Sequence, residues 1–350
     1  MKALLTLLMA CSMSTLLRAN VLTVSNNSTY PGQYSTIQTA VDAATAGDTI
    51  YIYPSALLYV ETVNITKRLV IIGSGANPQR PSRLSSFLTG INLTSSAASG
   101  SVLTGLHIYT TIVSGSDANP VDNLVVSDCK IDAGVCLFYG GNILIENCIF
   151  TANYSTGQGI QIPSYSTGNI IQNNYIFGYV ALRPGTNTII QNNIFASGDA
   201  NTVAFSDLQR GDPFGAGVKI LNNIFFISDP IAPRGVSDAC EYKNNIYHLT
   251  GDAPPVNAQS SGNINADPQF VNFPIGGAPF SFEYDLHLQP SSPGLHYGTD
   301  GKDVGMWGGP SPVNAGFEPP IPRIYDFKVN NATVPAGGTL QLTIKATRAQ

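Results

Sequence analysis

A short motif recurs along the middle of this 350-residue chain: an apolar stretch, then Asn-Asn or a close equivalent, then an apolar pair. The copies occupy Asn142–Phe150, Asn169–Phe177, Thr188–Phe195, Val218–Phe225 and Glu241–Tyr247, with a weaker one at Asn123–Ile131. From Ile131 to Tyr247, the last residues of successive copies are 19, 27, 18, 30 and 22 residues apart. Periods of this size are typical of repeat architectures, in which one short unit stacks on the next.

Each repeat is too short to fold alone, and its composition favours strands. Ile, Val and Phe fill the apolar stretches, Gly, Asn, Asp and Ser lie between them, and no repeat contains a convincing amphipathic helix. Such a unit can bury its apolar side only against the next copy, about 4.8 Å away. We therefore expect an all-β solenoid, a right-handed parallel β-helix, in which the unequal steps become loops of different length.

A second strand per coil lies between the motif copies. We place these strands at Val135–Phe138, Gly159–Ile162, Tyr179–Leu182, Thr202–Phe205 and Ile231–Val236, with earlier coils at Arg68–Ile72, Ile91–Leu93 and Val102–Ile108.

The asparagines of the motif fit the corners of such a coil. An Asn at the same corner of successive coils can pass a side-chain hydrogen bond to its neighbour, and Asn tolerates the left-handed backbone of tight corners. We expect one such corner to contain Asn147, Asn174, Asn193, Asn223 and Asn245.

Composition and the first residues point to export. Only 11% of residues are charged, against about 25% in typical globular proteins. The formal charge of −5 offers no basic surface for nucleic acid. Lys2, the apolar stretch from Ala3 to Leu17 and a small residue at Ala19 predict a signal peptide over residues 1–19, with lipidation of Cys11 as the alternative. No later segment is apolar enough to span a membrane, so a secreted or cell-surface location is expected.

Four cysteines remain after the predicted leader: Cys129, Cys136, Cys148 and Cys240. Cys129 and Cys148 hold the same place in consecutive repeats, so they should stack about one inter-strand spacing apart. That spacing exceeds the Cβ separation of about 3.8 Å that a disulfide prefers. We expect free, buried thiols.

Both ends of the repeat region resemble a known family. Tyr34–Tyr53 and Tyr59–Gly73 resemble the start of pectin-lyase-like right-handed β-helices, in which a short helix caps the open end of the coil. Thr36–Ala46 has the apolar spacing for that helix. Ala266–Asn272, Tyr284–Gly294 and Gly298–Gly308 resemble the closing segment of secreted bacterial, Bacteroidetes-type surface proteins. The resemblance implies a β-helix over residues 20–309 but no single activity, because this fold supports many functions.

The chain changes character after Gly309. Prolines are dense between residues 310 and 322, which predicts a stiff linker. Arg323–Val329 and Thr339–Lys345 alternate like two strands, so residues 323–350 are expected to begin an appended β-sandwich or anchoring module.

The chain lacks the familiar catalytic motifs of enzymes with this fold. The catalytic stretches of polygalacturonases, pectin methylesterases and pectate lyases are missing, and no His/Cys cluster suggests zinc. His107, His248, His287 and His296 are scattered and are interpreted as structural. No cofactor or metal is expected. A Ca²⁺ ion is considered only if the protein is a lyase.

One local concentration of charge suggests a binding strip. Arg183, Asp207, Arg210 and Arg234 follow the second strands of consecutive coils, with Tyr165 nearby. Stacked strands would align them on one face, where Arg can pair with a sugar carboxylate and Tyr can lie against the ring. The alternative is that these charges only pair with one another.

Two functions of different classes remain open. The first is a non-catalytic, exported, monomeric protein that contacts glycans or other surfaces. The second is a polysaccharide lyase that cleaves uronic-acid-containing chains by β-elimination.

Overall fold

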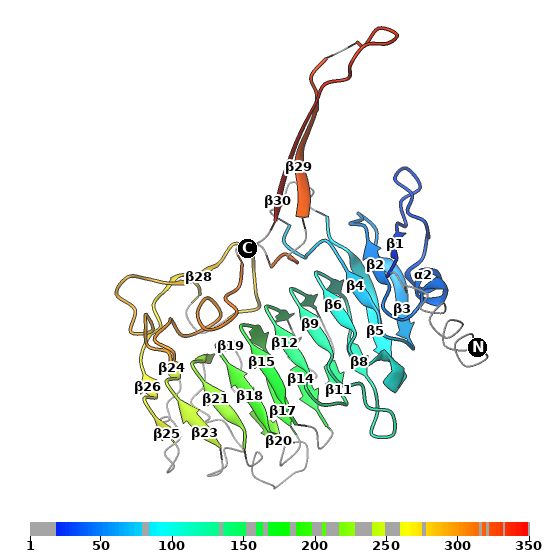
Figure 1. The fold of residues 1–350 in the computed structure, drawn as a ribbon. Coiled ribbons are helices and arrows are strands. Elements are labelled where there is room, and N and C mark those ends of the chain that lie inside the picture. The colour runs from blue at the N-terminus through cyan, green and yellow to red at the C-terminus, as the bar shows by residue number, and fades with distance from the viewer. Residues whose placement is uncertain are drawn as a thin grey trace, which may run out of the picture.

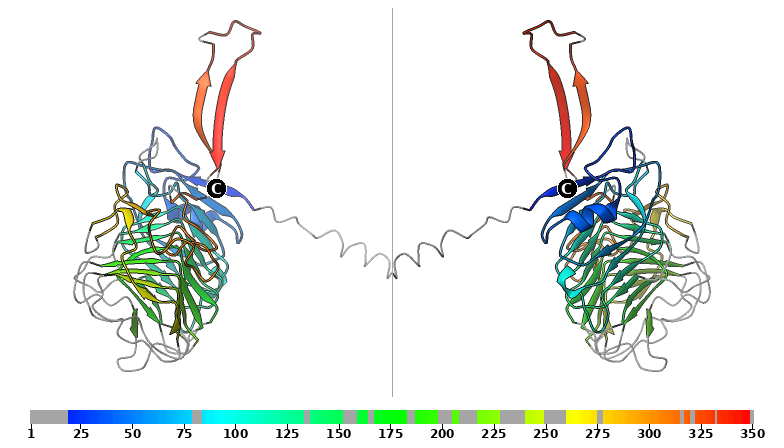
Figure 2. Two further views of the ribbon diagram at one scale, coloured as in Figure 1. Left: turned by 90° about the vertical axis from the view of Figure 1, so that its left-hand side faces the viewer. Right: turned by 90° about the vertical axis from the view of Figure 1, so that its right-hand side faces the viewer.

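The chain winds into a long coil of parallel strands, with a short helix at one end and a protruding hairpin (Figures 1 and 2). The computed structural model describes residues 19–78, 84–132, 136–151, 159–163, 167–182, 187–197, 205–207, 217–227, 240–248, 260–274, 278–314, 317–319, 322–331 and 333–348.

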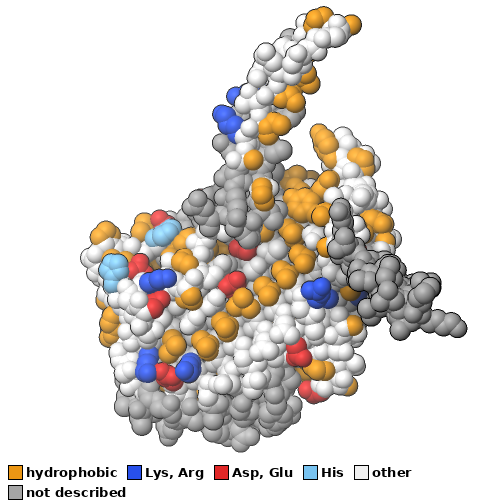
Figure 3. Space-filling model, in the orientation of Figure 1, with side chains coloured by type: hydrophobic (Ala, Val, Ile, Leu, Met, Phe, Trp, Pro, Cys, Tyr) orange, Lys and Arg blue, Asp and Glu red, His pale blue; other side chains and the backbone are white. Residues whose placement is uncertain are grey.

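One side of the coil is an eleven-stranded parallel sheet. Its strands, in spatial order, are β1 (Val21–Val24), β2 (Thr49–Ile52), β4 (Val70–Ile72), β6 (Val102–Thr104), β9 (Val125–Ser127), β12 (Leu144–Glu146), β15 (Asn169–Gln172), β18 (Thr188–Gln191), β21 (Lys219–Leu221), β23 (Glu241–Lys243) and β25 (Ser260–Ser261). Figure 3 shows hydrophobic side chains in a diagonal row across this side of the molecule.

The other two sides form one branched sheet around the long strand β5 (Phe87–Leu93), which also pairs with β3 (Tyr59–Ile65). One branch contains β8 (Ile112–Ser114), β11 (Cys136–Phe138), β14 (Gly159–Ile162), β17 (Tyr179–Leu182) and β20 (Phe205–Asp207). The other, which we call the closing face, contains β7 (His107–Ile108), β10 (Lys130–Ile131), β13 (Ile149–Thr151), β16 (Tyr175–Phe177), β19 (Ile194–Ser197), β22 (Ile224–Ile227), β24 (Ile246–His248) and β26 (Ile264–Asn265).

The predicted pairing of successive motif copies is confirmed. Leu144 lies beside Ile170 and Ile149 beside Tyr175, both in parallel register. The prediction of a capping helix within Thr36–Ala46 is confirmed. Helix α2 spans Ile37–Ala43, with Thr36 as its extended N-cap and extended backbone again at Ala44. Its buried residues Ile37, Ala40 and Val41 belong to the core inside the coil.

An asparagine ladder runs through one corner of the coil. Its members are Asn174, Asn193, Asn223, Asn245 and Asn263. The side-chain oxygen of Asn193 accepts from the backbone N–H and the side-chain amide of Asn174, each at 3.0 Å. The Asn193 amide in turn donates to the Ile171 carbonyl of the previous coil at 2.9 Å. The same pattern repeats at each step, so the buried amides are satisfied only when the coils are in register.

Asn147 lies at this corner but outside the ladder, because Cys148 takes the ladder position. The backbone N–H of Cys148 donates to Asn174 Oδ1 at 2.8 Å. The Cys148 thiol lies 3.6 Å from the Val126 carbonyl of the previous coil, and that of Cys129 lies 3.7 Å from the Leu103 carbonyl. The two cysteines thus extend the ladder column as thiols.

The prediction of free, buried thiols is confirmed for Cys129, Cys136, Cys148 and Cys240. Burial raises the pKa of Cys136 to about 12. Burial, aided by the neighbouring Cys129, also raises the pKa of Cys148. These two thiols are therefore protonated, inert core side chains.

A second, outward column lies one residue before the ladder. Asp128, Asn147, Asn173, Asn192, Asn222 and Asn244 all have left-handed backbone, with φ between 52° and 58°. Asn and Asp tolerate this conformation better than other non-glycine residues. Every motif copy therefore turns the same corner in the same way.

The closing segment, which we define as residues 266–319, turns back along this outward column (Figure 1). It starts with the antiparallel strands β27 (Phe270–Asn272) and β28 (Asp285–Leu288). The amide of Asn244 then donates to the Tyr297 carbonyl at 2.6 Å, and that of Asn173 donates to the Gly308 carbonyl at 2.7 Å. The corner asparagines thus fix the segment's path against the coil.

The closing segment also buries the closing face. A second hydrophobic cluster joins Ile149, Tyr175, Phe177, Ile194, Ile224 and Ile246 of the coil to Phe270, Leu286, Val304, Met306, Val313 and Phe317 of the segment. Val313 and Phe317, which fall in the predicted linker, pack in this cluster and are only 5% and 3% exposed.

The hairpin of β29 (Pro322–Val329) and β30 (Leu342–Arg348) projects away from the coil (Figure 2). Its two strands are antiparallel. Strand β29 covers the predicted Arg323–Val329, whereas β30 lies three residues later than the predicted Thr339–Lys345. The appended module itself stays a prediction. No helix in the described ranges is long and apolar enough to cross a membrane.

Replacing Asn193 by Ala should lower the free energy of unfolding by about 2–4 kcal/mol, because it leaves several buried groups without partners. Urea unfolding followed by circular dichroism measures this loss. Asn119→Ala, at an exposed position, is the matched control. Equal midpoints for the two variants would contradict the role assigned to the ladder.

Replacing Asp128 by Asn should change how stability depends on pH. Burial raises the pKa of Asp128 to about 7, against hydrogen bonds from Ser127 and Thr104 and with the help of the Glu146 charge. The native state therefore keeps a proton that the unfolded chain releases near pH 4, so this group lowers stability as pH rises from about 4 to about 7.

The amide that Asp128→Asn introduces cannot titrate, and Asn fills the same place in later coils. The free energy of unfolding of the variant, relative to that of the wild type, should rise by about 1.4 kcal/mol per pH unit across that window. Above the window the difference should stay constant. Denaturation curves at several pH values measure the difference, with the exposed Asp117→Asn as control. A difference that does not vary with pH would overturn the assignment.

Candidate functional site

Most of the predicted Arg/Asp strip lies outside the described residues. This applies to Arg183, Arg210, Arg234 and Tyr165. Asp207 is the last residue of β20 and pairs in register with Leu182, whereas the strip assumed that it follows the strand. The strip stays a prediction.

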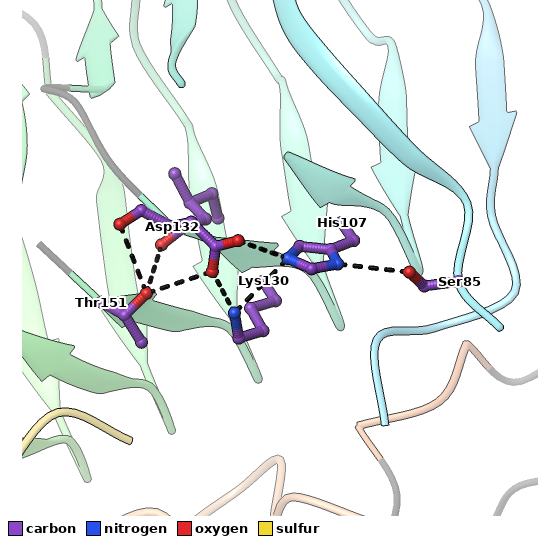
Figure 4. Close-up of polar contacts among 6 residues, drawn as sticks. Ser85, His107, Lys130, Asp132 and Thr151 are labelled. Carbon is purple, nitrogen blue, oxygen red and sulfur yellow. Dashed lines mark hydrogen bonds and ion pairs between the residues drawn. The ribbon is translucent and has the colours of Figure 1, made fainter. Parts of the chain in front are cut away.

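The structure brings together a different set of polar residues on the closing face, which we call the His107 cluster: Ser85, His107, Lys130, Asp132 and Thr151 (Figure 4). Lys130 of β10 pairs in register with His107 of β7 and with Ile149 of β13. Stacked coils therefore place side chains from three strands beside one another.

His107 lies at the centre of the cluster. Its Nε2 lies 2.6 Å from Asp132 Oδ2, and its Nδ1 lies 3.2 Å from Ser85 Oγ. Phe87 stacks on the imidazole with ring centroids 4.0 Å apart, which fixes the ring plane. These partners favour a tautomer in which Nε2–H donates to Asp132 and Nδ1 accepts from the Ser85 hydroxyl.

Asp132 carries the negative charge of the cluster. It pairs with Lys130 and accepts a hydrogen bond from Thr151 Oγ1 at 3.3 Å. Burial raises the pKa of this carboxyl, but the hydrogen bond from His107, the charge of the imidazole when it is protonated and the Lys130 ammonium outweigh it and bring the pKa to about 2. Asp132 is therefore ionised at neutral pH, and it holds His107 where Nδ1 can accept a proton.

A second feature, the aromatic cleft, has a volume of about 190 Å³. It is lined by Asn77, Phe280, Phe282, Tyr284, Asp285, Leu286, His287, Trp307 and Phe317. Phe280 meets Phe282 edge-to-face at 5.0 Å and Phe317 at 5.4 Å, so the walls hold one another in place. The volume is below the roughly 300–1,000 Å³ of drug-sized sites, so the cleft suits a single small ring.

Asp285 and His287 place a polar pair at the cleft. Asp285 Oδ1 accepts from His287 Nδ1 at 2.6 Å and from the His287 backbone N–H at 3.1 Å. Partial burial raises the pKa of Asp285, but the bonds and charge of His287 lower it further, so the net shift is downward. His287 stacks on Trp307 at 3.9 Å and stays 54% exposed, which leaves its Nε2 able to meet a ligand.

The cleft and the His107 cluster lie along one face. His107, Lys130, Ile149 and Tyr175 occupy the same register position in four successive coils, about 14 Å from end to end. Tyr175 contacts Phe280 of the cleft at 5.1 Å, and its hydroxyl donates to the Ala278 carbonyl. Figure 3 shows His side chains with charged neighbours beside β28.

Sequence reasoning took His107 and His287 as structural residues and did not single out Asp132, Asp285 or Trp307. Asp132 lies two residues after Lys130, and His107 lies in the previous coil at the Lys130 position. Repeat alignment could have suggested that group. The cleft gave no such signal, because Asn77 and Trp307 are far apart in the chain and meet only through the closing segment.

Comparison with solved structures finds proteins of low similarity to this chain. Pectate lyase Pel9A is 12% identical, with a TM-score of 0.44, covering 85% of this chain and 97% of its own. An alginate lyase from Paenibacillus sp. str. FPU-7 is 13% identical, with a TM-score of 0.39, covering 66% of this chain and 77% of its own. A rhamnogalacturonan lyase is 14% identical, with a TM-score of 0.33 and coverages of 67% and 69%.

At these identities and TM-scores, neither fold nor functional residues are inferred from these three proteins. The comparison with curated proteins found no match. The family described as "Right handed beta helix region" matches residues 18–248, more than half of the chain. This protein therefore belongs to the right-handed β-helix family.

Proposed function

We propose that this protein binds glycans without cleaving them, and that the aromatic cleft holds one sugar ring. The observation that carries this proposal is a ring-sized cleft walled by Phe280, Phe282 and Trp307, with Asp285 and His287 among its lining residues. A sugar presents apolar C–H faces and a rim of hydroxyls. Aromatic walls with a few convergent polar groups match both features.

The charges favour a neutral sugar in the cleft. Among the described residues that line it, Asp285 is the only carboxylate and none is Lys or Arg. A uronic acid would bring a second negative charge beside Asp285, whereas a hydroxyl can donate to that carboxylate and accept from the protein.

Export fits this role. The apolar stretch before Ala19 and the low charge content are typical of secreted proteins, and extracellular glycans are available only to an exported protein. The secreted or surface location is part of the proposal.

His287→Ala should weaken binding of the preferred neutral oligosaccharide at least tenfold, since it removes both a polar contact and the support of Trp307. Calorimetric titration against a panel of neutral oligosaccharides measures the affinity. His296→Ala is the matched control, because His296 also lies beside an aspartate, Asp303, but is 84% exposed and does not line the cleft. Equal affinities for the two folded variants, or no binding by the wild type, would contradict the proposal.

The second candidate is a polysaccharide lyase that uses the His107 cluster. The observation that favours it is an imidazole held by a carboxylate beside the Lys130 ammonium. In β-elimination His107 would take the C5 proton of a uronic acid, and Lys130 would stabilise the enolate. The enolate then forms the C4–C5 double bond as the C4–O bond breaks, and the leaving sugar oxygen takes up a proton from water.

Incubation with uronic-acid polysaccharides tests this candidate. The unsaturated product absorbs in the ultraviolet, and His107→Ala should abolish its formation whereas His248→Ala should not. If the protein binds glycans without cleaving them, the wild type and both variants should form no product.

A further inference from the structure

The first described strand begins at an unusual contact. The backbone N–H of Asn20 donates to Asp48 Oδ1 at 2.8 Å, where a continuing ladder would offer a backbone carbonyl. The Asn20 carbonyl accepts from the Thr49 N–H at 2.8 Å. Going back along the chain, Asn20 is thus the final residue that bonds to the neighbouring strand β2. Its N–H meets the Asp48 carboxylate in place of a backbone carbonyl.

Asp48 is a shielded carboxylate without a cation in the described part of the chain. Its side chain lies beneath the surface, with the residue 2% exposed. Its other oxygen accepts from the Thr45 N–H and the Thr45 hydroxyl, both at 2.8 Å. No Lys, Arg or His of the described ranges forms an ion pair with it. Hydrogen bonds from the Asn20 and Thr45 backbone N–H groups lower the pKa of Asp48, so its carboxylate is ionised and its negative charge faces the Asn20 nitrogen at the edge of an open depression.

The chain is accessible at the same point. Ala19 and Asn20 are both exposed. An open depression of about 550 Å³ adjoins them and is lined by Asn20, Val21, Leu22, Gln33, Tyr34, Ala43, Thr45 and Asp48. The peptide bond between Ala19 and Asn20 therefore lies at the surface, and its Asn20 N–H already donates to Asp48.

We propose that the chain is cleaved between Ala19 and Asn20 and that Asp48 binds the new α-ammonium group of Asn20. An endopeptidase of the export machinery adds one water across this bond, so the leader departs with the Ala19 carboxylate and the Asn20 amine takes up a proton. The apolar residues 3–17 and the small residue at Ala19 are features that such a peptidase reads, whereas Leu17 stands where a small residue is usual. This inference is independent of the glycan site.

Cleavage converts an existing contact into a stronger one. The N–H that donates to Asp48 becomes part of an ammonium group, so a neutral hydrogen bond becomes a charge-assisted ion pair without movement of the chain. Processing thereby tightens β1 onto β2 beside the capping helix α2.

The new contact should depend on pH. A free α-amino group titrates at about 7.7–8.0, and Asp48 would raise that pKa in the folded chain. The added stability is then fully present below about pH 7.7 and is lost as pH rises through the folded pKa.

Other charged groups of the surrounding elements already have partners or lie elsewhere. Lys67 donates to the carbonyls of Val41, Asp42 and Ala44, and Arg68 lies beside Gly47 and Gly100. Asp42 on α2 accepts from Gln38, and Tyr34 is the other titratable side chain lining the depression.

The first measurement is the intact mass of the protein recovered after export from a bacterial host. A chain that begins at Asn20 is expected. A chain that keeps the leader, or begins elsewhere, would overturn the proposal.

The second measurement compares two purified chains, one beginning at Asn20 and one with Gly-Ser added before it. The first should have an unfolding constant at least tenfold smaller at pH 6.5, and the gap should close in strongly alkaline buffer. Asp48→Asn should remove the gap, whereas Asp42→Asn should keep it. A gap that survives Asp48→Asn would show that Asp48 is not the receptor.

Should Asp48→Asn fail to fold, acetylation of the Asn20 amine removes the charge and leaves Asp48 intact. The acetylated chain should then match the extended chain in stability. If it keeps the full stability of the free amine, the proposal fails.

Discussion

Buried amide hydrogen bonds between successive asparagines hold this coil together. From Asn193 onward, each ladder side chain receives two hydrogen bonds from the asparagine of the previous coil and gives one to a carbonyl there. A slip by one residue would leave every one of these buried groups unpaired, at a cost of about 1–3 kcal/mol each. Register is therefore fixed at one corner and passed to both sheets, where the alternation of buried and partly exposed side chains specifies the same register.

The same dipeptide also builds the outside of the molecule. The second residue of each Asn-Asn pair joins the ladder, and the first takes left-handed backbone and points its amide at the closing segment. Because the ladder fixes the spacing of the first residues, they form a regular row of donors. The segment that follows this row supplies Phe280, Asp285, His287 and Trp307 to the aromatic cleft. The candidate binding site thus rests on the register of the coil.

Two aspartates four residues apart show how strongly position on the coil controls charge. Asp128 lies at the corner, 4% exposed and near Glu146, and burial raises its pKa to about 7. Asp132 lies on the closing face between His107 and Lys130, and these partners bring its pKa to about 2. Neighbouring coils, rather than neighbours in sequence, supply most of these partners.

The amino-acid sequence was enough to predict the coil. Its period, its Ile and Phe pairs and its Asn pairs require one short unit to stack in register, and the stacking of Cys129 on Cys148 follows from their shared place. Other features appear only once the chain is folded. The copy at Asn142–Phe150 has a single Asn before Cys148, so its sequence does not show that Cys148, and not Asn147, takes the ladder position. The aromatic cleft depends on the path of the closing segment, and that path is set by hydrogen bonds between residues more than 100 positions apart, such as Asn173 and Gly308.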